Sequence, residues 1–158
     1  MRLRGDVLAY IGYFGDVVFS VNQNYMLTPS NFEREGGSRW NDHALILHKP
    51  TSQFVGSELE KIKFNIILDV SHGVNPEEQL KILRNIRDNG FVLPLVINST
   101  PVTNNYWRLD SLKENNNYYG KNGELIHTEL ELSLTEYDDS NTVEAEFNEL
   151  KNILRWLL

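Results

Sequence analysis

The segment from Lys61 to Asn98 constrains the fold most strongly, because it reads as a strand, a helix and a strand joined by short links. Apolar and polar residues alternate over its first ten positions, and only Ile67 interrupts the polar set. Such alternation predicts a strand with one buried face. The residues expected on that face are Ile62, Phe64, Ile66, Leu68 and Val70.

A helix is expected directly after this strand. Asn75 can accept the first free amide protons, Pro76 fits the first helical position, and two glutamates follow at the positive end of the helix dipole. Asn89 and Gly90 provide a left-handed stop. The residues expected to face inward are Leu80, Ile82, Leu83 and Ile86.

Further strands are expected on both sides of this block. The almost wholly apolar segment Phe91–Ile97 predicts a strand that is buried on both faces. Gly120–Gly123 is a strong hairpin turn, because Asn-Gly tolerates positive φ. The other expected strands are Val17–Val21, Ala44–His48, Tyr106–Leu112 and Leu125–Tyr137, with residues 51–57 as a link that turns at Gly56 and Asn115–Asn117 as a polar tip.

The stretch Asn22–His43 is polar and rich in turn residues, which is typical of a long functional loop or a hairpin arm. It carries aromatic and arginine side chains, which are enriched at the energetic centres of protein interfaces. We therefore predict that it contacts another chain. The expected contact residues are Phe32, Arg34, Arg39 and Trp40.

Two large aromatic residues, Tyr13 and Phe14, lie between Gly12 and Gly15 at an expected bend. They fit either a glycine-permitted turn with core aromatics or a surface knob for a neighbouring subunit, so both are interface candidates. Residues 1–9 are expected to be a short leader.

The last 18 residues predict a second helix, with Asn141 as its cap and Glu144 three residues later. Its apolar stripe is wide enough to require a partner surface, either the sheet of its own chain or a neighbouring subunit, and the neighbour is favoured. The stripe consists of Val143, Phe147, Leu150, Leu154 and Leu157, and Ile153, Trp156 and Leu158 widen it.

The 158 residues suffice for one domain with a sizeable core. The absence of cysteine excludes disulfides and thiolate metal sites. The apolar runs are far shorter than the roughly 20 residues of a membrane span, and the first residues do not match a secretory signal. The expected fold class is α+β, with a mostly antiparallel sheet system, one internal helix and one terminal helix.

The net charge of −7 is concentrated at one end of the chain. Residues 1–123 carry 13 basic and 13 acidic side chains, whereas residues 124–158 carry nine acidic groups against Lys151 and Arg155. Binding to the outside of DNA needs a positive stripe, and the sequence shows none. The acidic segment fits a solvated face, a wall that repels nucleic acid, or a contact for a basic partner.

Residue patterns that indicate catalysis are weak. The histidines at positions 43, 48, 72 and 127 have no metal-binding spacing, and no Gly-x-Ser-x-Gly motif occurs. Two carboxylate pairs, Glu58/Glu60 and Glu129/Glu131, are the best enzyme candidates. A glycosidase needs carboxylates that face each other across a cleft, whereas pairs on one strand usually lie on its solvated side. We expect no catalytic, cofactor or metal site.

Several segments have a familiar order: IGYFGDVVF, LTPSNFEREGGSRW, and the block KPTSQFVGSELEKIKFNIILDVSHGVNPEEQLKILRNIRDNGFVLPLVIN. Together with Trp107 and the closing LTEYD, they resemble the phage tail protein U (GpU) family of contractile-tailed phages. The resemblance covers about residues 10–138. The leader 1–9 and the amphipathic extension 139–158 depart from the family pattern.

The resemblance implies a tail-tube-like β-barrel or sandwich with a helix on its side, and a structural role without catalysis or cofactor. It implies a ring at the tube–baseplate junction of a contractile phage tail or a phage-tail-like bacteriocin. The expected partners are other copies in a homo-oligomeric ring, with a hexamer favoured, and the tail tube, hub and other baseplate proteins. Assembly is expected in the host bacterial cytoplasm, with no membrane contact.

Within such a ring, DNA is expected only in passing through the lumen. Glu129 and Glu131 are expected to line that lumen, because an acidic wall repels the passing DNA. Two alternatives stay open. One is a tail terminator ring at the head-proximal end, and the other is a carbohydrate-acting baseplate enzyme that uses one of the carboxylate pairs.

Overall fold

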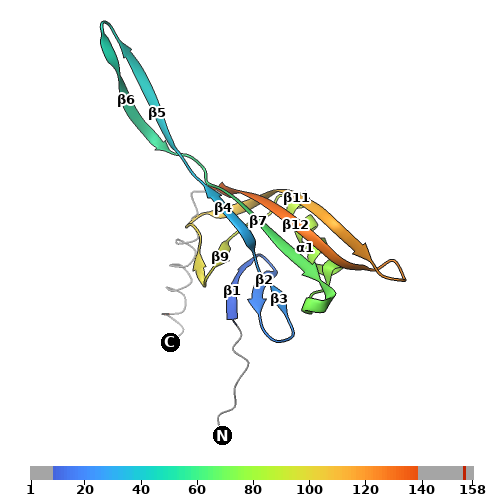
Figure 1. Cartoon of the computed structure of the whole chain (residues 1–158). Coiled ribbons are helices and arrows are strands. Elements are labelled where there is room, and N and C mark those ends of the chain that lie inside the picture. The colour runs from blue at the N-terminus through green and yellow to red at the C-terminus, as the bar shows by residue number, and fades with distance from the viewer. Residues whose placement is uncertain (1–8, 139–154, 156–158) are drawn as a thin grey trace.

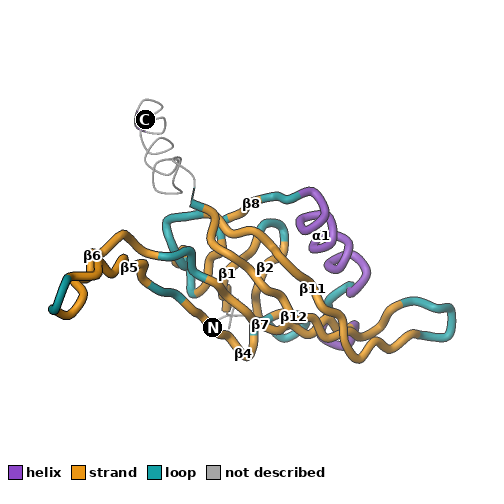
Figure 2. Tube along the Cα trace, turned by 90° about the horizontal axis from the view of Figure 1, so that it is seen from above, coloured by secondary structure: helices purple, strands orange, loops and turns teal. Residues whose placement is uncertain are grey.

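The computed structural model describes residues 9–138 and Arg155. Two five-stranded antiparallel sheets enclose one core, an α-helix lies beside them, and a two-stranded arm projects from one end (Figures 1 and 2). The expected leader, apart from Ala9, and the expected C-terminal helix, apart from Arg155, lie outside the described residues.

The first sheet is built on a hairpin of two strands, to which three short strands add. Tyr13 and Phe14 belong to the first strand, and the turn follows them at Gly15, which has a φ of 58°. The expected bend at these aromatics is therefore displaced by one residue. In the order β10-β9-β1-β2-β3, the strands are β1 (Ala9–Phe14), β2 (Val17–Val21), β3 (Met26–Leu27), β9 (Leu95–Ile97) and β10 (Thr100–Pro101).

The second sheet contains the long strands of the protein. Its centre is formed by β7 and β12, which pair over nine residues, and the hairpin partner of β12 is β11. In the order β4-β7-β12-β11-β8, the strands are β4 (Ser30–Glu35), β7 (Lys61–Asp69), β12 (Leu125–Tyr137), β11 (Tyr106–Tyr119) and β8 (Val92–Leu93).

The apolar residues that alternate along β7 are buried in the core, as predicted. Four of its expected inward residues are at most 1% exposed: Ile62, Phe64, Ile66 and Leu68. The ring of Phe64 meets the ring of Phe19 edge-on, with centroids 5.9 Å apart, and this contact joins the two sheets. The prediction is wrong for Val70, which starts the 3-10 helix η1 (Val70–His72) and is 54% exposed, because the strand ends at Asp69.

The predicted helix is confirmed as α1 (Pro76–Asn89). The side chain of Asn75 accepts the amide proton of Glu78, and Gly90 ends the helix with a φ of 64°. Leu80, Leu83 and Ile86 are buried, so the predicted stripe faces the core.

The expected strand Phe91–Ile97 is divided between the two sheets. β8 pairs with β11 in the second sheet, and β9 pairs with β1 in the first. Pro94 lies at the crossing, where its missing amide proton is not needed by either ladder. The prediction of burial on both faces is wrong for Phe91, which is 48% exposed, and holds at Leu95 and Val96.

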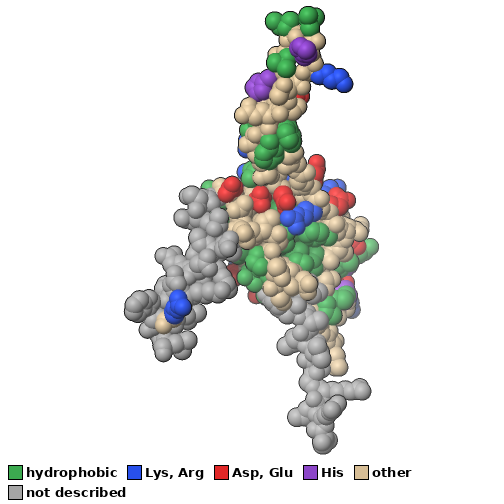
Figure 3. Space-filling model, turned by 90° about the vertical axis from the view of Figure 1, so that its left-hand side faces the viewer, with side chains coloured by type: hydrophobic (Ala, Val, Ile, Leu, Met, Phe, Trp, Pro, Cys, Tyr) green, Lys and Arg blue, Asp and Glu red, His purple; other side chains and the backbone are tan. Residues whose placement is uncertain are grey.

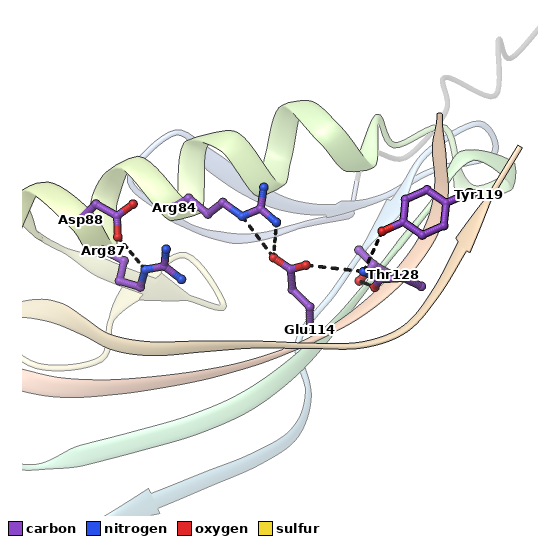
Figure 4. Close-up of polar contacts among 7 residues, drawn as sticks. Arg84, Arg87, Asp88, Glu114, Tyr119 and Thr128 are labelled. Carbon is purple, nitrogen blue, oxygen red and sulfur yellow. Dashed lines mark hydrogen bonds and ion pairs between the residues drawn. The ribbon is translucent and has the colours of Figure 1, made fainter. Parts of the chain in front are cut away.

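The hairpin β11–β12 turns at Gly120–Gly123, as predicted, but β11 is longer than expected. Asn117 lies inside the strand, where its amide oxygen accepts a hydrogen bond of 2.5 Å from the hydroxyl of the buried Thr128. The expected polar tip is thus part of the strand β11, where the pairing with β12 is irregular between Asn115 and Tyr118. Figure 4 shows how Arg84 of α1 reaches Glu114 of β11, with Nη2 2.5 Å from Oε1, so that the helix is fixed to this hairpin.

The arm is the hairpin of β5 (Ser38–Leu45) and β6 (His48–Ser57). It points away from both sheets (Figure 1). The expected strand Ala44–His48 is instead the turned end of this arm, and the expected turn at Gly56 lies in a strand. Both errors have one cause: the arm is exposed on both faces, so no alternation of apolar and polar residues marks its strands.

The fold class α+β is supported by this arrangement, in which strands predominate and one helix packs beside them. All strand pairs among the described residues are antiparallel, as expected. Within residues 9–138 the sheets form a sandwich, and neither closes into a barrel.

Candidate interaction surfaces

The arm is the most exposed part of the protein, and Trp40 lies at its base. Every residue from position 38 to position 55 is exposed. Trp40 is 56% exposed, its ring packs edge-on against the ring of Phe54 at 5.1 Å, and its Nε1 donates to Ser38 Oγ at 2.9 Å. Trp40 is therefore held in place on the surface, where the predicted contact with another chain needs it.

Polar contacts between the two strands continue along the arm. Ser52 Oγ donates to Asp42 Oδ1 at 2.5 Å, and His43 Nε2 lies 3.0 Å from Gln53 Oε1. A two-stranded hairpin that no third strand supports is only marginally stable in water. These cross-strand pairs, together with Trp40 and Phe54, give the arm a defined shape without a core beneath it.

The other predicted contact residues lie at or near the base of the arm. Phe32 of β4 stacks on the core residue Phe64 with centroids 6.1 Å apart and is 43% exposed. Arg34 makes an ion pair with Glu60, with Nη2 2.6 Å from Oε2. Arg39 is exposed in β5. Arg34 serves partly to fix the strand that leads into the arm.

The two aromatics of β1 have different surroundings. Phe14 is completely buried in the core, so its nomination as an interface residue is wrong for the structure of the single chain. It alternates with residues on the opposite face of the strand, and the sequence could not show which face was inward. Tyr13 is half-buried and stays an interface candidate.

The remaining candidates, Phe147, Leu150, Leu154, Trp156 and Leu157, lie outside the described residues. Their assignment to an interface stays a prediction.

The outer face of the second sheet carries Glu129 and Glu131, but lysines accompany them. Lys63 Nζ lies 2.8 Å from Glu131 Oε1, and Lys113 is directly opposite Glu131 in the ladder. The hydrogen bond from Lys63 lowers the pKa of the Glu131 carboxyl and raises that of its own amino group. Glu33, opposite Lys63, completes a row of alternating charge across four strands.

This row bears on the predicted acidic lumen. Glu131 is compensated by two lysines, so it adds little net negative charge to this face. An open groove of about 480 Å³ crosses the same face and has a mixed lining. Its charged lining residues are Glu33, Arg34, Glu35, Lys61, Lys63 and Asp110. The lumen assignment stays a prediction.

A polar cluster lies near the far end of this sheet. His127 Nδ1 is 2.6 Å from Asp69 Oδ2, and Glu129 Oε1 is 3.7 Å from His127 Nε2. Hydrogen bonds from the Ser71 hydroxyl, then from His127, hold the pKa of the Asp69 carboxyl at about 2, below its usual 3.8. The cluster ties β7 to β12 and starts η1, since Asp69 also accepts the amide proton of Ser71.

The carboxylates considered for catalysis do not form a pair across a cleft. Glu58 and Glu60 lie in the link between β6 and β7 rather than on a strand, and Glu60 is engaged by Arg34. Glu129 and Glu131 lie on one strand and have different partners. In the described part of the chain, no group of three or more His, Cys, Asp or Glu side chains is placed to hold a metal ion.

Sequence reasoning missed the end of the arm, where Leu45, Ile46 and Leu47 are 50%, 89% and 98% exposed. A run of aliphatic residues before a proline is typical of a short buried strand, so composition could not reveal this exposure. Figure 3 shows these hydrophobic side chains at the end of the arm. No helix among the described residues is long and apolar enough to cross a membrane.

Comparisons with known proteins add one match. The family model described as Phage P2 GpU matches residues 15–139, a range that contains the arm, α1 and every described strand except β1. No protein of the curated set matches the chain.

Proposed function

The chain belongs to the Phage P2 GpU family, and we propose that it forms a ring at the junction of the tail tube and the baseplate. Membership of the family makes it a structural protein of a phage tail, located in the virion tail and in contact with other tail proteins. Beyond family membership, we propose the ring, its place in the tail and its partners.

One observation carries the proposal of a ring subunit: an arm of two strands projects from the body with all its side chains exposed from position 38 to position 55. No residue of the arm belongs to the buried core, and its base bears Trp40, Phe54 and Arg39, which are aromatic and arginine residues of the kind enriched at interfaces. A projecting element that contacts a different surface of the next copy generates a closed ring or an open helix.

The proposed partners in this ring are other copies of the chain, with a hexamer favoured, and the tail tube, hub and other baseplate proteins. The particle is a contractile phage tail or a phage-tail-like bacteriocin assembled in the bacterial cytoplasm. A tail terminator ring at the head-proximal end is the alternative. Glu129 and Glu131 face away from the core, which is compatible with a lumen that DNA passes through.

The test is to locate the protein in an assembled particle. Particles from cells that produce the tagged chain are purified and imaged with a label against the tag, and the stoichiometry of the ring is measured by native mass spectrometry. We expect the label at the baseplate end of the tube. A label at the head-proximal end would favour the terminator ring, and particles without the chain would exclude both.

No arrangement of the candidate carboxylates supports the alternative of a carbohydrate-acting enzyme, because neither pair faces across a cleft. Replacement of Glu129 and Glu131 by glutamine, tested for hydrolysis of bacterial cell wall against the unmodified chain, would detect such an activity. We expect no difference between the two.

A further inference from the structure

The end of the arm is an exposed turn made of aliphatic residues, where polar residues or glycine are usual. Leu45, Ile46 and Leu47, here called the arm tip, form a run of aliphatic side chains, and the last is 98% exposed. Exposed runs of this kind mark contact sites, because a chain gains nothing by holding them in water. No other residue with a large hydrophobic side chain among the described ones is as exposed as Leu47.

The backbone of the arm tip makes the same point independently. The tip joins two paired strands, since Leu45 is opposite His48, and Leu47 has a φ of 58°. This left-handed conformation favours glycine or asparagine and is strained for leucine. In the other long hairpin, β11–β12, a glycine takes such a position: Gly123 has a φ of 79°. Because the arm tip forgoes suitable turn residues, its side chains are explained by a contact rather than by the turn.

The charges of the molecule indicate the kind of partner. The arm, residues 38–57, carries Arg39 and Lys49 against Asp42, and adds two histidines. The other described residues carry ten basic and sixteen acidic side chains. An anionic membrane or a nucleic acid would attract the arm but repel this acidic body, whereas a second copy offers the arm an acidic surface of opposite sign.

The shape of the chain excludes the body of the same copy as the docking surface. The arm leaves the sheets beside β4 and points away from them, and the β11–β12 turn lies at the opposite end (Figures 1 and 2). A contact between the arm of one copy and the body of the next therefore joins different surfaces and can repeat around a ring.

We propose that the arm tip docks onto the acidic body of a second copy of this chain. The inference deepens the proposed ring and rests on that function for the number of copies joined. The apolar tip is buried at the contact, and Lys49, two residues after the tip, meets carboxylates of the second copy around it, while Arg39 adds positive charge at the base of the arm. Because these charges are near the surface, the association weakens as salt is added.

The test replaces the tip by residues that suit its turn. In the Ile46→Asn/Leu47→Gly variant, the aliphatic surface is lost while Asn-Gly satisfies the hairpin. Self-association of the purified full chain is measured by sedimentation velocity over a wide range of concentration. We expect the variant to associate at least about tenfold more weakly than the unmodified chain, and its melting temperature to stay the same. Lys121→Ser in the β11–β12 turn is the matched control and should associate like the unmodified chain.

Two results would overturn the inference: an unmodified chain that stays monomeric throughout, or a variant that associates as strongly as the control. Flotation with phosphatidylglycerol vesicles provides a third, in which the tip binds lipid instead of a second copy. Failure of the proposed function is seen separately, as absence of the chain from purified particles. If the chain is present there and the variant assembles normally, only the docking of the tip is wrong.

Discussion

The two long hairpins of this protein differ in how they are supported: one packs against the rest of the chain, and the other is exposed on both faces. The β11–β12 hairpin is backed by β7 and α1, turns on glycines, and buries Leu130, Leu132 and Leu134 on one face. The β5–β6 arm pairs with no third strand within residues 9–138 and turns on Ile46 and Leu47. The first hairpin is stabilised within the chain, whereas the second exposes what a chain normally buries. The comparison separates residues that build the fold from residues available to a partner.

The largest expected difference between the two regions concerns two phenylalanines. Phe64 of β7, the strand that pairs with β12, is completely buried, whereas Phe54 of the arm is 57% exposed. Phe64→Ala should lower the free energy of unfolding by about 3–5 kcal/mol, because it leaves a cavity in the core. Phe54→Ala should lower it by about 0.5 kcal/mol or less. Chemical denaturation of both variants measures this, and equal losses would mean that the arm is part of the cooperative core.

The next effect is expected in assembly rather than in folding. Trp40→Ala removes the largest side chain at the base of the arm and should cost about 2 kcal/mol of association free energy, as hot-spot residues do. The thermal melt of the monomer should change little, since Trp40 packs mainly on Phe54. Sedimentation velocity measures the first quantity and calorimetry the second. A large drop in melting temperature with normal assembly would place Trp40 among the folding residues.

The same contrast explains which elements sequence reasoning could predict. β7, α1 and β12 bury one face, so their apolar residues recur at the period of the element, and the caps at Asn75 and Gly90 mark the ends of the helix. The arm buries neither face and therefore has no period. Its residues 44–48 consequently looked like one short strand, whereas the chain turns at Ile46 and Leu47 between two strands.

The candidate contact residues show the same limit. Trp40 and Arg39 could be nominated from residue type and a polar surrounding, and both are exposed. Phe14 was a candidate because it lies between two glycines, which fitted either a core aromatic or a surface knob. It is buried, and a strand beside two glycines does not reveal which of its faces is inward. The compensation of Glu131 by Lys63 was also hidden, since 68 positions separate them and only strand pairing brings them together.

A smaller effect on stability should come from the hydrogen bond between Asp69 of β7 and His127 of β12, which supports the β11–β12 hairpin. Asp69 has a pKa of about 2 in the folded protein against 3.8 otherwise, because Ser71 and His127 hydrogen-bond to its carboxylate. A lowered folded-state pKa gives stability that is complete above pH 3.8 and is lost as the pH falls through about 2. The loss should be on the order of 1 kcal/mol, because water screens the partly exposed carboxylate.

Denaturation curves at a series of acid pH values test this contribution. In Asp69→Asn the part of the pH dependence that belongs to this carboxyl should disappear, while Asp42→Asn in the arm serves as the control and should leave it in place. If Asp69→Asn retains the full acid slope, the carboxylate is not coupled to folding and the hairpin depends on its apolar face alone.

The smallest expected effect concerns the two turns themselves. Gly123 has a φ of 79° and no atom within 4 Å of an added Cβ, so Gly123→Ala would suffer only the backbone strain of a left-handed residue. It should cost about 1 kcal/mol in the free energy of unfolding, partly offset by the lower entropy of the unfolded chain. Leu47→Gly makes the reverse change at the arm tip and should be neutral or slightly stabilising. Urea denaturation of the two variants decides the comparison: if Leu47→Gly destabilises the chain as much as Gly123→Ala, the leucine is needed by the arm's own structure, and its exposure does not point to a partner.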